Sequence, residues 1–173
     1  MSTGEVGDVI MAEVNIRRAT VADAELLAGL NKDIQQIHAD AYPSLFKQPD
    51  NFAEFVADFE THKLSDVDGF VLIIEADQQA VGYIYAKVVT RPENAYVYAQ
   101  KLMLVDVIAI KPAYQKKGYG QKLINAVRDE ALAQGIHRML LDTYEFNANA
   151  QQFYVKLGFK RMKIQMALDL NQQ

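Results

Sequence analysis

Hydrophobic residues are spaced in two different ways along this chain, and the spacing changes near residue 69. Before that point they recur every three or four residues, which predicts amphipathic helices at 20–38 and 51–62. Thr20 followed by Asp23 is typical of a helix start. The side chains predicted to face inward from these helices are Leu26, Leu27, Leu30, Ile34, Ile37, Phe52, Phe55, Val56 and Phe59.

Beyond residue 69 the apolar residues form short runs bounded by turn-forming sequences. These runs predict strands at 70–75, 82–89 and 97–110. The links between them, at 77–79 and 91–94, are short and carry turn residues. Since short links join antiparallel strands, the three strands should form an antiparallel meander.

The last third of the chain alternates helices and strands. A helix is predicted at 118–134, a strand at 136–142, a second helix at 147–157, and strands from 159 to 168. Because a helical crossover joins parallel neighbours, the strand before 118–134 and the strand after it should be parallel. The side chains predicted to face inward from the helix at 118–134 are Leu123, Ile124, Val127 and Ala131.

Together these elements predict a mixed α/β fold with a largely antiparallel sheet. A further strand is expected at 14–18, whereas residues 1–11 show no periodicity and should form a flexible extension. The length of 173 residues suits one domain of ordinary size, so a single domain is expected over 12–173.

Composition excludes several kinds of chemistry. The chain has no Cys, so it can form neither a disulfide nor a thiolate nucleophile. Its three His are scattered without the spacing of a metal site, so no metal is expected. A net charge of −4 argues against a nucleic-acid partner, and no apolar run is long enough to span a membrane. No export signal is visible, so the cytoplasm is the expected compartment.

One loop carries an unusual concentration of positive charge. A buried strand ending near Pro112 runs through Gln-Lys-Lys-Gly-Tyr-Gly, residues 115–120, into a helix. The glycines allow successive backbone N–H groups to converge on an anion, and the helix N-terminus adds its positive dipole. The lysines that crowd this stretch are Lys111, Lys116, Lys117 and Lys122. A pyrophosphate would suit such a loop, and a lysine-rich surface turn is the alternative.

The loop differs from two common phosphate-binding motifs. A dinucleotide fingerprint would need a third glycine at the position of Leu123, and an ATP-type loop would need Gly-Lys followed by Ser or Thr. What remains is Gln-x-x-Gly-x-Gly. A second motif follows at 147–159, where the chain reads Asn-x-x-Ala-x-x-Phe-Tyr-x-x-x-Gly-Phe. In this order, the two motifs resemble those of the GNAT acyl-CoA N-acyltransferases, and the resemblance covers roughly 14–166.

That resemblance implies a fold and a cofactor. The sheet would have helices on both faces and would splay apart at a bulge, and the thioester of acetyl-CoA would enter the gap. The strand end at 107–110 would align the pantetheine arm, and 115–121 would hold the pyrophosphate. The residues that the resemblance assigns to the cofactor are Val107, Ile108, Ala109, Ile110, Gln115, Lys116, Lys117, Gly118, Tyr119, Gly120, Gln121, Asn147 and Tyr154. For Asn147, a helix N-cap is an equally good interpretation.

The resemblance also implies catalytic roles. Tyr154 matches the tyrosine that gives a proton to the departing CoA thiolate, although a tyrosine that only packs on an amphipathic helix is the alternative. Asp106 is the first choice for a general base and Glu145 the second. For each of these acids the alternative, a solvated or salt-bridged carboxylate, is the commoner role of an acid on a strand edge or a loop.

The amine acceptor would lie among aromatic side chains. One part of the pocket would be the loop after the first helix, residues 38–46, with His38 and Tyr42 as candidates, and the other part would be the meander, with Tyr83 and Tyr85. Tyr98 is a further aromatic in the same region. Core packing explains the tyrosines almost as well, and a helix-end His is often a dipole partner.

The predicted function is therefore N-acetyl transfer from acetyl-CoA to the primary amine of a small molecule or peptide, by direct attack in a ternary complex. An acyl-enzyme is not expected, because the chain offers no Cys and no evident Ser-His pair. The alternative is a non-catalytic acyl-CoA-binding sensor or scaffold domain of the same fold. A homodimer is expected only from the habit of the family.

Overall fold

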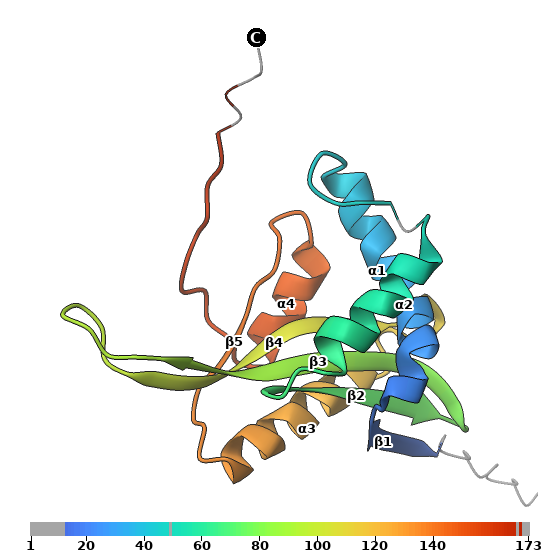
Figure 1. The fold of residues 1–173 in the computed structure, drawn as a ribbon, viewed down its shortest axis with the longest axis horizontal. Helices are drawn as coiled ribbons and strands as arrows, with labels where there is room; N and C mark the ends of the chain where they lie inside the picture. Colours follow the sequence, from blue (N-terminus) through green and yellow to red (C-terminus); the bar gives the residue numbers. More distant parts are fainter. Residues whose placement is uncertain (1–12, 49, 169, 171–173) are drawn as a thin grey trace, which may run out of the picture. The chain divides into compact units, whose positions relative to one another are not determined.

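The computed structural model describes residues 13–48, 50–168 and 170. These residues form two compact units, of which the first ends at Asp142 and the second begins at Thr143. The first unit holds the sheet and most of the helices, and the second holds one helix and the chain after it (Figure 1). The predicted extension 1–11 lies outside the described residues, and the single domain over 12–173 stays a prediction.

Five strands form one sheet in the order β1-β2-β3-β4-β5. They are β1 Val14–Arg18, β2 Gly69–Ala76, β3 Gln79–Arg91, β4 Gln100–Ile110 and β5 Met139–Leu141. The first four are antiparallel neighbours, and β5 runs parallel to β4. The predicted fold class, the meander and the parallel pair are confirmed, although β5 is shorter than the predicted strand at 136–142.

The two hairpins of the meander turn differently. Between β2 and β3, Asp77 and Gln78 both adopt positive φ, the conformation that favours a tight two-residue hairpin. Between β3 and β4 the chain forms a long hairpin whose tip extends past the other strands (Figure 1). There the side chain of Asn94 accepts hydrogen bonds from the N–H groups of Tyr96 and Val97. This local turn uses backbone donors that a strand would need, so β4 begins at Gln100 rather than at 97.

Helices cover both faces of the sheet within the first unit (Figure 1). A 3₁₀ turn, Val21–Asp23, leads into α1, Ala24–Ala41, and α2, Phe52–Asp58, continues as a short π-helical segment, Phe59–Lys63. These helices lie on one face, and α3, Tyr119–Ala133, lies on the other. The helix start at Thr20 is confirmed, because Thr20 and Asp23 form a capping box.

Each face of the sheet has its own core. On the α1 side, Leu27 and Phe59 pack with Ile73 of β2 and Tyr83 of β3. On the other side, the four predicted inward residues of α3 are all buried. Of the predicted inward residues of α1, Leu26 and Ile37 are instead exposed, because Ala24, Leu27 and Ala28 set the buried face.

An arginine ties β1 to the start of the helical layer. The guanidinium of Arg17 makes a bidentate pair with Asp23, at 2.8 and 3.0 Å, and also donates to Glu75 of β2 at 2.8 Å. The side-chain hydrogen bond from Arg17 lowers the pKa of the Asp23 carboxyl to about 2. The carboxylate form of Asp23 is therefore part of the folded structure.

In the second unit, α4 runs over Ala148–Lys156 and is capped by Asn147, whose side chain accepts the N–H of Ala150 at 3.1 Å. Gly158 takes positive φ just after the helix. From Phe159 to Leu168 the described chain forms no strand, so the predicted strands at 159–168 are wrong for this structure. A strand needs a partner to hydrogen-bond with, and none pairs with this segment among the described residues.

Candidate active site

A bulge interrupts the pairing of β3 with β4. Tyr85 pairs with Val107 and Ala86 pairs with Val105, so Asp106 is an extra residue without an opposite partner on β3. Such a bulge bends the strand that carries it and exposes the extra residue. Asp106 is accordingly exposed at the point where β4 changes direction.

Past the bulge, β4 has a pairing partner on only one side. The parallel pairing with β5 spans only Met103 to Val105, and no described strand pairs with that edge of β4 further along. On the β3 side, Lys111 donates its N–H to the backbone oxygen of Val81 at 2.8 Å. Every second residue of a strand hydrogen-bonds to the same neighbour, so Ala109 also faces β3. The N–H and C=O of Ile108 and the N–H of Ile110 therefore point to the other edge, where no described strand pairs with them and an extended ligand could.

The loop after β4 is held against the strand end by its first motif residue. The side-chain amide of Gln115 donates to the backbone oxygen of Ile110 at 3.0 Å. A 3₁₀ turn, Pro112–Tyr114, brings the chain back far enough for this bond. Gln115 thereby fixes the loop relative to the free edge of β4.

The helix that follows has a first turn without a side-chain cap. Gly118 is the N-cap of α3 in the left-handed conformation, with φ of 85°, and it has no side chain to donate or accept. The first hydrogen bond that it accepts comes from Lys122 at 3.1 Å. The N–H groups of Tyr119, Gly120 and Gln121 precede that bond and have no acceptor within the helix. They form a cluster of donors at the positive end of the helix dipole.

The two motif glycines play different roles. Gly118 needs its positive φ, whereas Gly120 lies in the first turn of α3 without one, so the expected backbone freedom applies to Gly118 alone. Lys116 also adopts positive φ, at 61°. The ammonium group of Lys117 sits 5.3 Å from the ring centroid of Tyr114. The four loop lysines are exposed and form no ion pair within the described part of the chain.

The proton-transfer candidates are divided between the two units. Asp106 belongs to the first, and Glu145 and Tyr154 belong to the second. Tyr154 is 9 % exposed, its ring packs with Phe153 and Phe159, and burial raises its pKa to about 12. The phenol therefore keeps its proton at neutral pH. Glu145 is exposed in the loop before α4.

Asn147 is the N-cap of α4, the role that the sequence suggested as the alternative to cofactor binding. Its side-chain oxygen is used by the cap, and its amide nitrogen is a remaining donor. A contact between Asn147 and the cofactor stays a prediction.

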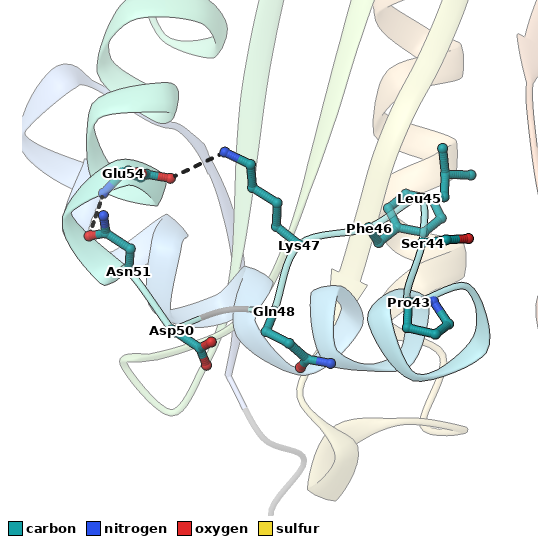
Figure 2. Close-up of a pocket in the computed structure, with 9 residues that line it drawn as sticks. All are labelled: Pro43, Ser44, Leu45, Phe46, Lys47, Gln48, Asp50, Asn51 and Glu54. Carbon is teal, nitrogen blue, oxygen red and sulfur yellow. Dashed lines mark hydrogen bonds and ion pairs between the residues drawn. The ribbon is translucent and has the colours of Figure 1, made fainter.

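The loop between α1 and α2, together with the first turn of α2, forms an exposed pocket of about 560 Å³. Figure 2 shows this pocket, with Lys47 reaching Glu54 across it at 3.7 Å. Its lining residues are Pro43, Ser44, Leu45, Phe46, Lys47, Gln48, Asp50, Asn51 and Glu54. The predicted acceptor residue His38 is next to it, with its ring edge-on to Phe46 at 4.9 Å and its Nδ1 2.7 Å from the oxygen of Ile34. Tyr42 is the C-cap of α1.

Tyr83 and Tyr85 lie in the core rather than at an open surface. Tyr83 is fully buried and its hydroxyl donates to Asn31 at 2.7 Å, while the hydroxyl of Tyr85 donates to Asp66 at 2.5 Å. Burial raises the pKa of both phenols, and the nearby Asp106 charge adds to the effect. We therefore do not propose either ring as an acceptor contact. Tyr98 is exposed near the tip of the β3–β4 hairpin, outside the strand.

Sequence reasoning did not find the polar partners of these tyrosines. Asn31 is 52 residues from Tyr83 and Asp66 is 19 residues from Tyr85, and no motif links either pair. The lining of the loop pocket beyond Phe46 was also missed, because nothing in its sequence distinguishes it from an ordinary loop.

The described residues contain no group of three potential metal ligands. None of the described helices is long and apolar enough to cross a membrane.

Comparison with known proteins agrees with the site. The model of the acetyltransferase (GNAT) family matches residues 31–159. An alanine N-acetyltransferase of ribosomal protein bS18 from Haemophilus ducreyi is 30 % identical over 93 residues, which are 51 % of this chain and 63 % of that relative. The chain thus spans less than two thirds of that protein.

Solved structures share the fold. A mutant of the Bacillus halodurans protein BH1408 superposes with a TM-score of 0.78 at 25 % identity, covering 90 % of this chain and 99 % of that one. A predicted acetyltransferase of Clostridium acetobutylicum, solved with acetyl-CoA, has a TM-score of 0.67 at 19 % identity and covers 91 % and 97 %. The family match over 31–159 includes the lysine-rich loop 115–120, called the anion loop below, and the second motif at 147–159. The chain therefore belongs to the acetyltransferase (GNAT) family, as the two motifs predicted.

Proposed function

We propose that this protein is an N-acetyltransferase that moves the acetyl group of acetyl-CoA to a primary amine in one step. The observation that carries the proposal is a pair of features that follow each other in the sequence. A strand edge at Ile108 and Ile110, whose N–H groups pair with no described strand, leads within ten residues to a helix N-terminus without a side-chain cap and with lysines around it. An extended amide-containing arm suits the strand edge, and a pyrophosphate suits the helix start.

Cofactor binding would use mainly backbone groups. The N–H groups of 119–121 would donate to the pyrophosphate, and the exposed lysines would offset its negative charge. The cofactor arm would pair with the free edge at 107–110, as a peptide adds to a sheet. The solved relative from Clostridium acetobutylicum contains acetyl-CoA, which supports this choice of cofactor.

The chemistry requires one bond to form and one to break. The neutral amine nitrogen attacks the thioester carbonyl carbon, and the tetrahedral intermediate collapses with loss of the C–S bond. The amine loses one proton and the CoA thiolate gains one, so the products are an amide and free CoA thiol. A free backbone N–H of the β4 edge would polarise the carbonyl oxygen.

We assign the two proton transfers to acidic and phenolic side chains. Asp106 is the proposed base, because the bulge exposes its carboxylate beside the free edge of β4. Glu145 is the second choice. Tyr154 is the proposed acid, since its matching motif position and its retained proton suit a donor to a thiolate. Asn147 is the proposed donor to the cofactor arm.

The acceptor is an amine of a small molecule or a peptide. The relative from Haemophilus ducreyi acts on the alanine of a ribosomal protein, which is an amine of this kind. The pocket after α1, with His38 and Tyr42 nearby, is the proposed acceptor side of the site. The cytoplasm is the proposed compartment for a chain without cysteine.

Two measurements test the proposal together. Acetyl-CoA at 100 times its dissociation constant should stabilise the protein by about 2.7 kcal/mol, which thermal denaturation detects. Thiol release from acetyl-CoA should then be screened over amino acids, polyamines, aminoglycosides and peptide N-termini. If acetyl-CoA caused no thermal shift, the proposal that it is the cofactor would be excluded. A shift without turnover on any amine would favour the alternative, a non-catalytic acyl-CoA-binding domain.

A further inference from the structure

Three carboxylates lie near the buried tyrosines of β3, beside the bulge. Burial is the main cause that raises the pKa of Tyr83 and Tyr85, and the charges of Asp106 and Asp58 raise both further. The third carboxylate, Asp66, accepts the hydroxyl of Tyr85 at 2.5 Å. Because such charges act over a short range, the three acids belong to one polar group on the face of the sheet that α1 covers.

Two of these acids already have partners within the protein. Both oxygens of Asp66 accept hydrogen bonds, one from the hydroxyl of Tyr85 and the other from the N–H of Asp68 at 3.0 Å. The carboxylate of Asp58 forms an ion pair with Lys63. Neither Asp66 nor Asp58 therefore needs a ligand to satisfy its charge.

Asp106 and Lys87 differ from these acids, because neither forms an ion pair within the part of the chain that the structure describes. Asp106 is exposed at the bulge. Lys87 is half-buried on β3, and its ammonium group lies 5.9 Å from the centroid of the Tyr85 ring. Taking a cation partly out of water costs free energy that an ion pair would offset. Lys87 is therefore a half-buried cation to which the described chain supplies no counter-ion.

The two groups stand on neighbouring strands at the bulge. Lys87 of β3 pairs with Leu104 of β4, Tyr85 pairs with Val107, and Asp106 is the extra residue of the bulge. Alternate residues of a strand share a face, so Lys87 lies on the same face as the two tyrosines. Diagonal neighbours on one face of an antiparallel pair have Cβ atoms roughly 5–8 Å apart. One small ligand with two charged ends is therefore long enough to reach both Lys87 and Asp106.

We propose that the acceptor is an amine that also carries an anionic group, a carboxylate or a phosphate, and that Lys87 binds this group while Asp106 takes the proton of the amine. This assignment rests on the proposed acetyl transfer, in which Asp106 is the base. The amine and the anionic group must be only a few bonds apart, as in an amino acid, an amino alcohol phosphate, or a peptide with an acidic residue near its N-terminus. A purely cationic acceptor would instead meet Lys87 as a like charge.

Pairs of acceptors that differ only in the anionic group test the proposal. They are β-alanine and β-alaninamide, phosphoethanolamine and ethanolamine, and peptides that begin with Ala-Glu or Ala-Gln. Thiol release gives kcat/KM for each acceptor, and the ratio of the anionic to the neutral member is compared between enzymes, which cancels the difference in basicity of the two amines. The first two pairs show whether a carboxylate or a phosphate is preferred.

Lys87→Gln should lower that ratio about tenfold, because a hydrogen bond between two charged groups is lost. Lys87→Arg should keep most of the ratio, and Lys87→Glu should reverse the preference. Lys101→Gln is the matched control. It removes the same charge from β4, where Lys101 is exposed and pairs with Thr90 on the opposite face of the sheet. This control should leave the ratio unchanged, and circular dichroism checks that all four variants fold.

The outcomes separate this inference from the proposed function. If amines are acetylated but Lys87→Gln leaves the ratio unchanged in every pair, the role of Lys87 is refuted and acetyl transfer stands. The same conclusion follows if only acceptors without an anionic group react, or if Lys101→Gln lowers the ratio as much as Lys87→Gln. If the folded wild-type protein acetylates no amine at all, the proposed function and the inference fail together.

Discussion

Replacing Gly118 by alanine should destabilise the protein through backbone strain alone. The residue has φ of 85° and ψ of −2°, and a Cβ built there meets no atom within 4 Å. The left-handed conformation costs an alanine about 1–2 kcal/mol. The lower entropy of the unfolded alanine chain offsets about 0.4–1 kcal/mol of that cost. The net loss should therefore be near 1 kcal/mol, according to these two terms.

Gly29 provides a matched control for the same chemical change. It lies inside α1, it is exposed, and a Cβ there also meets nothing within 4 Å, but its φ is not positive. Gly29→Ala should stabilise the protein by about 0.5–1 kcal/mol, because alanine is the better helix former. The two variants should then differ by about 1.5–2 kcal/mol, or by roughly 3–8 °C in melting temperature for a chain of this size.

Urea denaturation followed by circular dichroism measures both values, with an unchanged slope showing that only stability has moved. If Gly118→Ala were as stable as the wild type, or if the order of the two variants were reversed, the backbone argument would fail. Acetyl-CoA gives a second measurement. The thermal shift that it causes should be smaller for Gly118→Ala and unchanged for Gly29→Ala, since only the first alters the donors of α3.

Three further predictions concern other parts of the molecule. A Cβ at Gly82 would lie 2.5 Å from the backbone oxygen of Ala109, so Gly82→Ala must displace β4 and should cost about 1–3 kcal/mol in urea denaturation; an unchanged midpoint would contradict this. The lowered pKa of Asp23 contributes stability that is present above its ordinary value near 4 and is lost as pH falls toward 2. Asp23→Asn should flatten that part of the acid denaturation curve, by about 1 kcal/mol because solvent screens the exposed side of Arg17. Tyr154→Phe should lower kcat about 10²-fold or more without changing the dissociation constant of acetyl-CoA, and unchanged turnover would exclude Tyr154 as the acid.

Local sequence patterns were sufficient to predict α3 and the loop before it. Its apolar residues repeat with helical period, and Gly118 and Gly135, both with positive φ, bound it. Periodicity and glycine conformation are properties of a short stretch of chain, so the sequence alone predicts them well. The anion loop was predicted for the same reason, since its donors, glycines and lysines are all contained in a dozen consecutive residues.

The site also depends on pairings that no short stretch contains. The bulge at Asp106 arises from the register of β4 against β3, which the two strands determine jointly. Tyr83 and Tyr85 were predicted to contact the acceptor, but residues of α1 and Phe59 pack with them and both rings lie in the core. Whether an aromatic residue binds a ligand or packs depends on what covers it.

The segment at 159–168 shows most clearly the difference between what the sequence predicts and what tertiary pairing decides. Its alternation predicts a strand, and the chain there remains unpaired among the described residues. A helix satisfies its hydrogen bonds within itself, so period and caps in the sequence are enough to predict α3. A strand satisfies them only with a neighbour, and therefore the tertiary structure alone decided where β4 bulges, which of its edges is free, and which predicted strands form.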